Sequence, residues 1–199
     1  MEDKFSVIIP TLLRSIHLES LLYNLQQSCY VDEIILIDNT GSYRSSLSKV
    51  RVITRGENIF VNPAWNLGVR EARNENLCIC NDDINFNPDV FPFIFLHIDK
   101  GIIGLDTSNY YLSHDEDFTI ESIKERCWGW GCCFFIKKSN YKTIPEQMKI
   151  ACGDDFLIKH IPAFVIKGLK ISWTSISTTS FNKEFLKIQE EDLNYFKTL

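Results

Sequence analysis

The sequence predicts an α/β fold with a mixed, mainly parallel central sheet flanked by helices. Two observations support this prediction. Short, continuously apolar runs rich in β-branched residues, such as residues 5–10 and 31–37, are typical of strands buried on both faces. These runs alternate with segments in which apolar residues recur at helical spacing. The order strand, helix, strand implies a βαβ unit with a right-handed crossover.

The composition fits one soluble domain. With 199 residues, 45% of them hydrophobic and 24% charged, the chain can bury one full core. A net charge of -5 and the lack of a basic run disfavour nucleic acid as the main partner. The longest apolar stretches, such as residues 91–96, are too short to span a bilayer, and residues 1–4 lead into the first strand without the basic and apolar regions typical of a signal peptide. We therefore expect no transmembrane segment and a cytoplasmic protein.

The cysteines indicate the same compartment. There are seven, an odd number, and none forms a Cys-x-x-Cys pair. Such spacing is typical of buried thiols in a reducing environment, and it disfavours a disulfide scaffold or a zinc site.

The first βαβ unit can be followed residue by residue. Pro10 ends the first strand, because proline cannot donate to a sheet ladder. Ser15 is a plausible N-cap for a helix whose leucines recur at helical spacing: Leu18, Leu21, Leu22 and Leu25. The second strand, residues 31–37, closes in a cluster of turn formers, and residues 51–54 predict a short third strand.

A second helix is expected to begin with Asn62 as N-cap and Pro63 at the first helical position. One face of this helix carries small residues that allow close packing on the sheet: Ala64, Gly68 and Ala72. Asn66 lies on a neighbouring face near the positive end of the helix, where a polar side chain can meet a ligand. Ordinary capping or solvation would explain Asn66 equally well.

The next strand, residues 77–80, is followed directly by Asn81, Asp82 and Asp83. Ligands bind open α/β sheets at the carboxyl ends of parallel strands, and adjacent carboxylates suit Mg²⁺ or Mn²⁺. An acidic surface turn is the alternative for this pair taken alone. Asn87, Pro88 and an Asp in the first helical turn then predict a helix to residue 98, which makes the loop over residues 81–86 short and well defined.

The second half of the chain is less regular. Strands are expected at residues 101–105 and 170–173, and an amphipathic helix after residue 182. Residues 113–126 are charged and lack clean periodicity, so we expect them to be the most mobile region. Residues 127–136 hold two tryptophans separated by glycines and lead into an apolar strand.

Two features of this half are candidate functional elements. Glycine beside aromatic residues, as at Trp130 and Gly131, lets backbone approach a flat ligand, although a packed core corner fits the pattern as well. Asp154 and Asp155 form a second acidic pair, before a helical run that Pro162 stops. Helix capping is the alternative for these two.

Phosphate-binding glycine motifs are missing. Neither Gly-x-Gly-x-x-Gly nor Gly-x-x-x-x-Gly-Lys-Ser/Thr occurs, which argues against a dinucleotide dehydrogenase and a P-loop enzyme. A metal ion held at an acidic strand end can neutralise phosphates instead.

The order of these elements resembles the family-2 glycosyltransferases of the GT-A fold, which is Rossmann-like. The resemblance rests on residues 7–11, 32–39, Asn66 with Gly68, and 81–83; residues 131–138 and 153–155 match more loosely. It implies an inverting transfer of a sugar from a nucleoside diphosphate donor, most commonly a UDP-hexose, to a hydroxyl of a glycan or other acceptor. Residues 1–98 would form the nucleotide-sugar-binding half of a single domain, and residues 99–199 the acceptor-binding half.

The resemblance also assigns roles. Thr11 and Asp38 would line the nucleoside pocket, and residues 81–83 occupy the family's Asp-x-Asp position, with Asn81 in place of the first Asp. Asp83 would bind the Mn²⁺ or Mg²⁺ ion, with Asp82 close to the ribose or the metal. Asp155, or Asp154 beside it, would be the general base.

Two other functions remain open at this point. A nucleotidyltransferase can have a similar sheet, but it usually carries a glycine-rich turn after the first strand, which is absent from residues 11–14. A non-catalytic sugar-nucleotide-binding module would bind the donor and metal without turnover.

Overall fold

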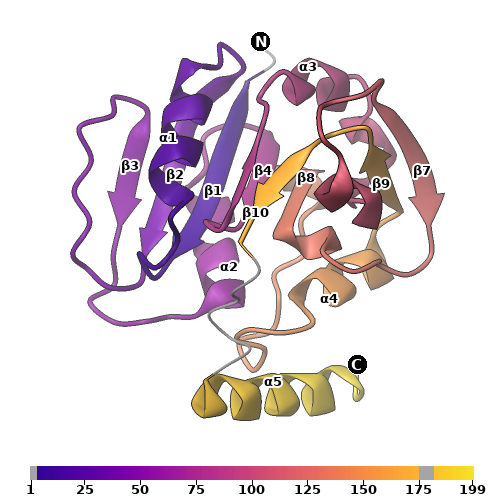
Figure 1. Cartoon of the computed structure of the whole chain (residues 1–199). Helices are drawn as coiled ribbons and strands as arrows, with labels where there is room; N and C mark the ends of the chain where they lie inside the picture. Colours follow the sequence, from indigo (N-terminus) through magenta and orange to yellow (C-terminus); the bar gives the residue numbers. More distant parts are fainter. Residues whose placement is uncertain (1–3, 175–181) are drawn as a thin grey trace.

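The computed structural model describes residues 4–174 and 182–199, and within them it has a large central sheet and a small two-stranded one (Figure 1). The large sheet has the strand order β3-β2-β1-β4-β8-β6-β9-β7. Its strands are β1 (Phe5–Thr11), β2 (Val31–Asp38), β3 (Val50–Ile53), β4 (Asn76–Cys80), β6 (Ile102–Leu105), β7 (Thr119–Ile123), β8 (Cys133–Lys137) and β9 (Ala163–Lys167). The small sheet pairs β5 (Ile84–Phe86) with β10 (Ile171–Trp173).

The α-helices are α1 (Leu18–Gln27), α2 (Val61–Glu71), α3 (Val90–Phe95), α4 (Gly153–His160) and α5 (Lys183–Phe196). Short 3₁₀ turns are η1 (Ile98–Lys100), η2 (Thr107–Tyr111), η3 (Trp130–Cys132) and η4 (Lys138–Asn140). In the part of the chain that the structure describes, no helix combines the length and the apolar character needed to cross a membrane.

The sheet is mixed and mainly parallel, as the sequence predicts. Strands β3, β2, β1 and β4 are mutually parallel, whereas β8 runs antiparallel to both β4 and β6. Cys133, the first residue of β8, pairs with Cys80, the last residue of β4. The start of β8 therefore lies at the same edge of the sheet as the carboxyl ends of β1, β2 and β4.

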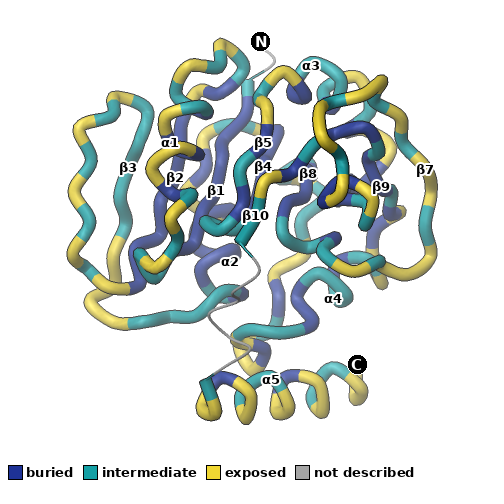
Figure 2. Tube along the Cα trace, in the orientation of Figure 1, coloured by how far each residue is buried: buried dark blue, intermediate teal, exposed yellow. Residues whose placement is uncertain are grey.

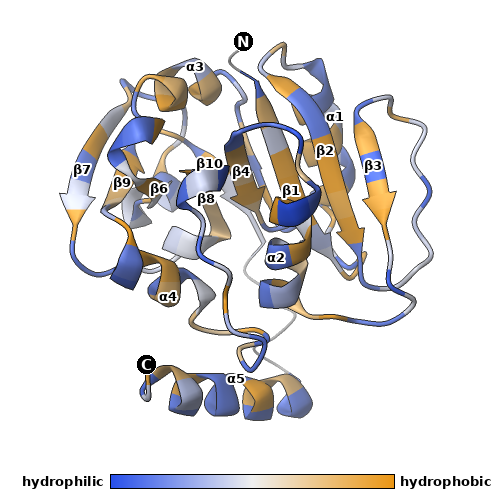
Figure 3. Cartoon of the chain, turned by 180° about the vertical axis from the view of Figure 1, so that it is seen from behind, coloured by the Kyte–Doolittle hydropathy of each residue, from blue (hydrophilic) through white to orange (hydrophobic). Residues whose placement is uncertain are grey.

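Helices cover both faces of the sheet and create two cores. On one face, buried residues of α1 and α3 pack against alternate residues of β1, including Phe5 and Val7. On the other face, residues of α2 and α4 pack against Ile8 and its neighbours. The central strands β1, β2 and β4 are accordingly among the most buried and most apolar parts of the chain, whereas the edge strands β3 and β7 are more exposed (Figures 2 and 3). Helix α5 lies apart from these layers, beyond α2 and α4 on the side of the C-terminus (Figures 1 and 3).

Close packing of α2 depends on a glycine. A Cβ atom on Gly68 would lie 2.3 Å from the Cγ2 atom of Ile8 in β1. The small-residue face predicted for this helix is therefore confirmed at Gly68, and it brings α2 directly onto the sheet.

Three predicted helix starts are wrong. Helix α1 begins at Leu18 after His17, because the Ser15 hydroxyl accepts a hydrogen bond from the His17 N–H instead of capping the helix. Helix α2 begins at Val61, so Asn62 lies within its first turn, and its buried amide donates to the Ala151 carbonyl at 3.0 Å. Helix α3 begins at Val90 and ends at Phe95, short of the predicted residue 98.

Other corrections concern short strands whose partners are distant in sequence. Strand β9 was not predicted, nor was β5, which lies in the predicted loop over residues 81–86 and pairs with β10. The region expected to be mobile, residues 113–126, contains β7, an edge strand paired with β9. Short strands of this kind are fixed by pairing rather than by local periodicity.

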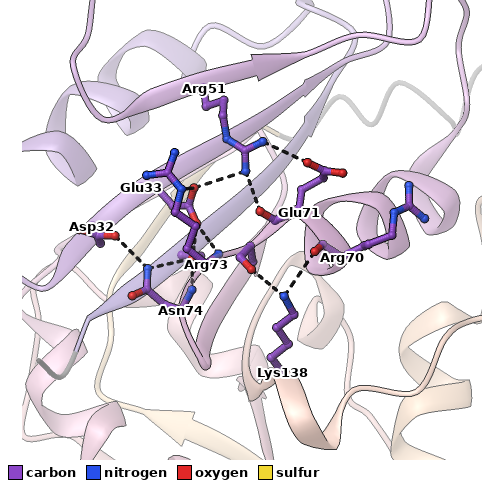
Figure 4. Close-up of polar contacts among 10 residues, drawn as sticks. Asp32, Glu33, Arg51, Arg70, Glu71, Arg73, Asn74 and Lys138 are labelled. Atoms are coloured by element: carbon purple, nitrogen blue, oxygen red, sulfur yellow. Dashed lines mark hydrogen bonds and ion pairs between the residues drawn. The ribbon is translucent and has the colours of Figure 1, made fainter. Parts of the chain in front are cut away.

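A polar network fixes the loop between α2 and β4, at the end of the sheet opposite the carboxyl ends of β1 and β2 (Figure 4). The buried Glu33 carboxylate accepts hydrogen bonds from the Ser6 hydroxyl at 2.8 Å and the Arg73 N–H at 2.7 Å. Its other oxygen lies 3.4 Å from Arg51 Nη2. The Lys138 ammonium donates to the Ala72 carbonyl at 2.6 Å, which ties the end of β8 to the same loop. The Glu33 carboxylate and the Lys138 ammonium therefore hold this loop against the sheet.

Candidate active site

A cleft of about 690 Å³ lies between the carboxyl edge of the sheet and α5. Strand β1 contributes Pro10 and Thr11, the segment after β4 contributes residues 81–83, and the segment before β8 contributes residues 128–129 and 131–132. Helix α5 closes the cleft with Phe185 and Gln189. The structure thus places three separately predicted sites, Thr11, residues 81–83 and Gly131, in one cavity.

Asp82 and Asp83 are the acidic centre of this cleft. The Thr11 hydroxyl donates to Asp82 Oδ2 at 2.5 Å, which links the end of β1 to the end of β4. Burial raises the pKa of Asp82 to about 6, although the Thr11 bond opposes this rise. Burial also raises the pKa of Asp83, and its Oδ1 atom is buried with no hydrogen-bond partner among the described residues. A buried carboxylate oxygen without a partner is costly unless a cation or donor meets it.

Asn81 lines the cleft beside this pair. Its backbone N–H donates to the Cys132 carbonyl at 2.8 Å, which extends the pairing of β4 with β8 by one residue. The backbone therefore fixes where the acidic pair leaves the sheet.

The second acidic pair approaches the cleft from α4. Asp154 lines the cleft, and its carboxylate lies so close to Gly131 that a Cβ atom there would be 2.3 Å from Oδ2. Asp155, which does not line the cleft, lies with Oδ1 2.7 Å from Arg126 Nε, and Asp154 Oδ2 lies 3.3 Å from the same nitrogen. Burial raises the pKa of Asp154, and the Arg126 charge opposes that rise. One guanidinium thus joins the two carboxylates.

Besides Asp155, three predicted site residues lie outside the cleft lining. The Asn66 amide is engaged by the segment that follows β8: it donates to the Ile144 carbonyl at 2.9 Å and accepts from the Tyr141 hydroxyl at 2.9 Å. Trp130 is fully buried, stacks on Phe134 and donates through Nε1 to the Phe164 carbonyl at 3.0 Å. Both are structural residues, so their prediction as ligand contacts is corrected.

Asp38 is the third. Its buried carboxylate accepts hydrogen bonds from the Thr40 N–H at 2.8 Å and the Tyr43 N–H at 2.7 Å, and so shapes the turn after β2. The next residue, Asn39, lines the cleft instead. Asn39 rather than Asp38 therefore faces the cleft, and Asp38 holds the turn that follows it.

Sequence reasoning missed several lining residues. Trp128, Trp173 and Tyr110 form an aromatic cluster in the cleft wall, and Arg126 also lines the cleft. The tryptophan–glycine stretch was a signal for Trp128, but nothing local distinguished it from Trp130. Trp173 reaches the cleft only because β10 pairs with β5, where Trp173 lies opposite Ile84.

A metal site is not complete on protein groups alone. The described residues include no cluster of three or more His, Cys, Asp or Glu side chains that could hold a metal ion. Asp82 and Asp83 nevertheless fit a site in which substrate phosphates supply further oxygens, since Mg²⁺ is commonly bound by one or two carboxylates plus phosphate and water. The partnerless Asp83 oxygen is the observation that fits such an ion.

Comparisons with known proteins agree with this architecture. The sequence model of glycosyl transferase family 2 matches residues 6–160. The structure of S. aureus TarS residues 1–349 is similar at a TM-score of 0.62 and 16% identity, over 98% of this chain and 72% of that one. The same TarS fragment in complex with UDP-GlcNAc gives 0.64 and 14%, over 93% of this chain and 64% of that one. A sequence search among curated proteins found no match.

A second solved protein shares the fold. GalNAc-T7 in complex with UDP, GalNAc and Mn²⁺ is similar at a TM-score of 0.59 and 12% identity, over 85% of this chain and 43% of that one. The chain therefore spans under half the length of that structure, and at these identities the likeness shows a shared fold. The family model, in contrast, covers most of the sequence, including both acidic pairs. With its mixed GT-A sheet, the chain belongs to glycosyl transferase family 2.

Proposed function

We propose that this protein transfers a sugar from a UDP-sugar to an acceptor hydroxyl with inversion, and that it uses a divalent cation. The partnerless Asp83 carboxylate oxygen, beside Asp82 at the carboxyl end of β4, carries this proposal. Two desolvated carboxylates need positive charge, and a nucleoside diphosphate with Mn²⁺ or Mg²⁺ brings both the charge and the oxygen ligands. TarS is solved with UDP-GlcNAc and GalNAc-T7 with UDP and Mn²⁺, which supports this donor class and this cofactor.

The donor would lie along the sheet edge. Thr11 and Asn39, which line the cleft at the ends of β1 and β2, would contact the nucleoside, while Asp82 and Asp83 would hold the cation. When bound, the ion would stabilise the negative charge of the departing diphosphate. Residues 1–98 then form the donor-binding half of the domain and residues 99–199 the acceptor half.

Asp154 is the better-placed general base of the two candidates. It lines the cleft, whereas Asp155 lies outside the lining and contacts Arg126 more closely. In the reaction, the acceptor hydroxyl gives its proton to the Asp154 carboxylate, and its oxygen bonds to the anomeric carbon. The bond from that carbon to the phosphate oxygen breaks on the opposite face, and UDP leaves. Burial, which raises the Asp154 pKa, makes the carboxylate a stronger proton acceptor.

A thermal-shift screen tests the donor class. Ligands that bind only the folded protein raise the unfolding midpoint according to their affinity. We expect UDP-sugars to raise the midpoint with Mn²⁺ present and much less without it. Equal shifts with and without metal would contradict the cation, and no shift with any nucleotide sugar would contradict the donor class. Release of UDP during turnover would exclude a nucleotidyltransferase, which releases pyrophosphate, and also a non-catalytic module.

A further inference from the structure

Three aromatic rings from distant parts of the chain meet in the wall of the cleft. Trp128 lies 4.9 Å from Tyr110 and 5.4 Å from Trp173, measured between ring centroids, and the Tyr110 and Trp173 rings are 5.6 Å apart. Tyr110 is only 8% exposed, whereas Trp128 is 54% exposed. The Trp128 ring is thus exposed in the cleft and packs against the Tyr110 and Trp173 rings.

The backbone around Trp128 is fixed. The Tyr110 hydroxyl donates to the Gly129 carbonyl at 2.7 Å, and Gly129 has a φ of 78°, a conformation that favours glycine. A Cβ atom on Gly129 would lie 2.5 Å from the Tyr110 ring. Since the ring is held before any ligand arrives, binding to it costs little ordering entropy.

The sheet order places the segment that carries Trp128 on one side of the acidic pair. Strands β1, β4 and β8 are consecutive in the sheet, and Thr11, Asp83 and Trp128 belong to the segments at their ends. On the proposed function, the donor extends from Thr11 to Asp83. The cleft beyond Asp83, lined by Trp128 and Asp154, remains for the acceptor.

The charges there favour a neutral ligand. The charged side chains among the described lining residues are those of Asp82, Asp83, Asp154 and Arg126. The only cation among these four, Arg126, is already paired with Asp154 and Asp155. An anionic acceptor would meet repulsion, whereas hydroxyl groups can donate to Asp154 and accept from the remaining N–H groups of Arg126.

We propose that the acceptor is a neutral saccharide whose pyranose ring stacks on Trp128. One face of a pyranose presents C–H groups that pack on an indole ring, while the hydroxyls at its edge reach polar groups. This inference rests on the proposed function, because it assigns the acceptor class of the same cleft. It adds a specificity-determining role for Trp128, with Tyr110 and Trp173 positioning its ring.

Saturation-transfer NMR on the full chain tests this directly. The probes are the methyl glycosides of glucose, galactose, mannose and N-acetylglucosamine, in the presence of UDP and Mg²⁺, which is diamagnetic. We expect saturation on the C–H protons of one ring face for at least one glycoside. Trp128→Ala should weaken that binding roughly tenfold, and Trp128→Phe should restore most of it. Tyr23→Ala, an exposed aromatic on α1 outside the cleft, is the matched control and should change nothing.

The outcomes separate this inference from the proposed function, because UDP affinity is measured calorimetrically on the same samples. Unchanged UDP affinity in Trp128→Ala, with loss of glycoside contact, supports the stacking site. If wild type binds UDP but transfers saturation to none of the four glycosides, the inference is wrong and the donor site stands. If Trp128→Ala loses UDP affinity, the ring serves the nucleotide, and the inference is again wrong. If UDP does not bind wild type, the proposed function fails, whatever the glycosides show.

Discussion

Arg126 Nε lies 2.7 Å from Asp155 Oδ1 and 3.3 Å from Asp154 Oδ2, so a single guanidinium holds the acidic pair of α4 at the cleft. Of the two carboxylates, Asp154 alone lines the cleft, and it packs on Gly131. The two carboxylates therefore have different surroundings: Asp154 faces the cleft, whereas Asp155 lies outside the lining and pairs with Arg126.

The first expectation follows from this division. Asp154→Asn removes the proton acceptor but preserves shape, so we expect turnover to fall about a hundredfold or more with donor affinity unchanged. Asp155→Asn should lower turnover less, because it only weakens the ion pair with Arg126. Steady-state rates and UDP calorimetry on both variants check this. If Asp155→Asn instead shows the larger loss of turnover, the base is Asp155.

A second expectation concerns Asp192, which docks α5. Its buried carboxylate accepts hydrogen bonds from three successive backbone N–H groups, at 2.9 Å from Lys149, 2.6 Å from Ile150 and 2.8 Å from Ala151. Asp192→Ala leaves these donors unsatisfied and should lower the free energy of unfolding by about 1–3 kcal/mol. Hydrogen exchange should show faster opening of α5 and of residues 149–151. Glu191→Ala, one residue away and exposed, is the control. Equal exchange in both variants would contradict the anchoring role.

A third expectation tests the packing of α2 on β1. Gly68→Ala places a methyl group where Ile8 Cγ2 now lies, so overpacking should cost about 1–3 kcal/mol of unfolding free energy. Alanine otherwise favours helices, so a stabilised variant would mean that the helix can shift away from the sheet. Denaturant unfolding measures the difference, and Arg70→Ala on the exposed face of α2 serves as the matched helix control.

A fourth expectation concerns pH. Burial of Asp38 by itself raises its pKa, but hydrogen bonds from the Tyr43 and Thr40 backbone and the Thr40 hydroxyl outweigh it, and the net pKa is lowered. A carboxyl group whose pKa is lower in the folded state adds stability above its unfolded pKa of about 4, and this is lost as pH falls through the folded value. The difference in unfolding free energy between wild type and Asp38→Asn should therefore shrink from pH 7 to pH 3. A difference that is constant over this range would contradict the assignment.

The sequence predicts the parallel strands in the first half of the chain well, because β1, β2 and β4 are continuous apolar runs, which is the local pattern of strands buried on both faces. The acidic end of β4 follows from the same pattern. Trp130 and Trp128 occupy equivalent places in a local Trp-Gly repeat, and only the turn before β8 decides which ring enters the core. From its spacing alone, Asn66 is likewise a polar residue near a helix start. Its contacts with Tyr141 and Ile144, about 75 positions later in the chain, are not visible in the local sequence.

Strands β5 and β10 show the same limit. Each has three residues, and each is defined by a partner more than eighty positions away. Their pairing brings Trp173 to the cleft, a position that no local spacing encodes. What could not be predicted from sequence is therefore mostly the part of the cleft around Trp128 and Trp173, which is assembled from non-local contacts.

Calorimetric titration of UDP with and without Mn²⁺ shows whether Asp83 binds a divalent cation together with the nucleotide. In wild type, we expect Mn²⁺ to tighten UDP binding at least tenfold. In Asp83→Asn this enhancement should disappear with the thermal midpoint preserved, while Asp99→Asn, an exposed carboxylate on η1, should behave as wild type. Metal-enhanced UDP binding that survives in Asp83→Asn would rule out Asp83 as a ligand of the cation.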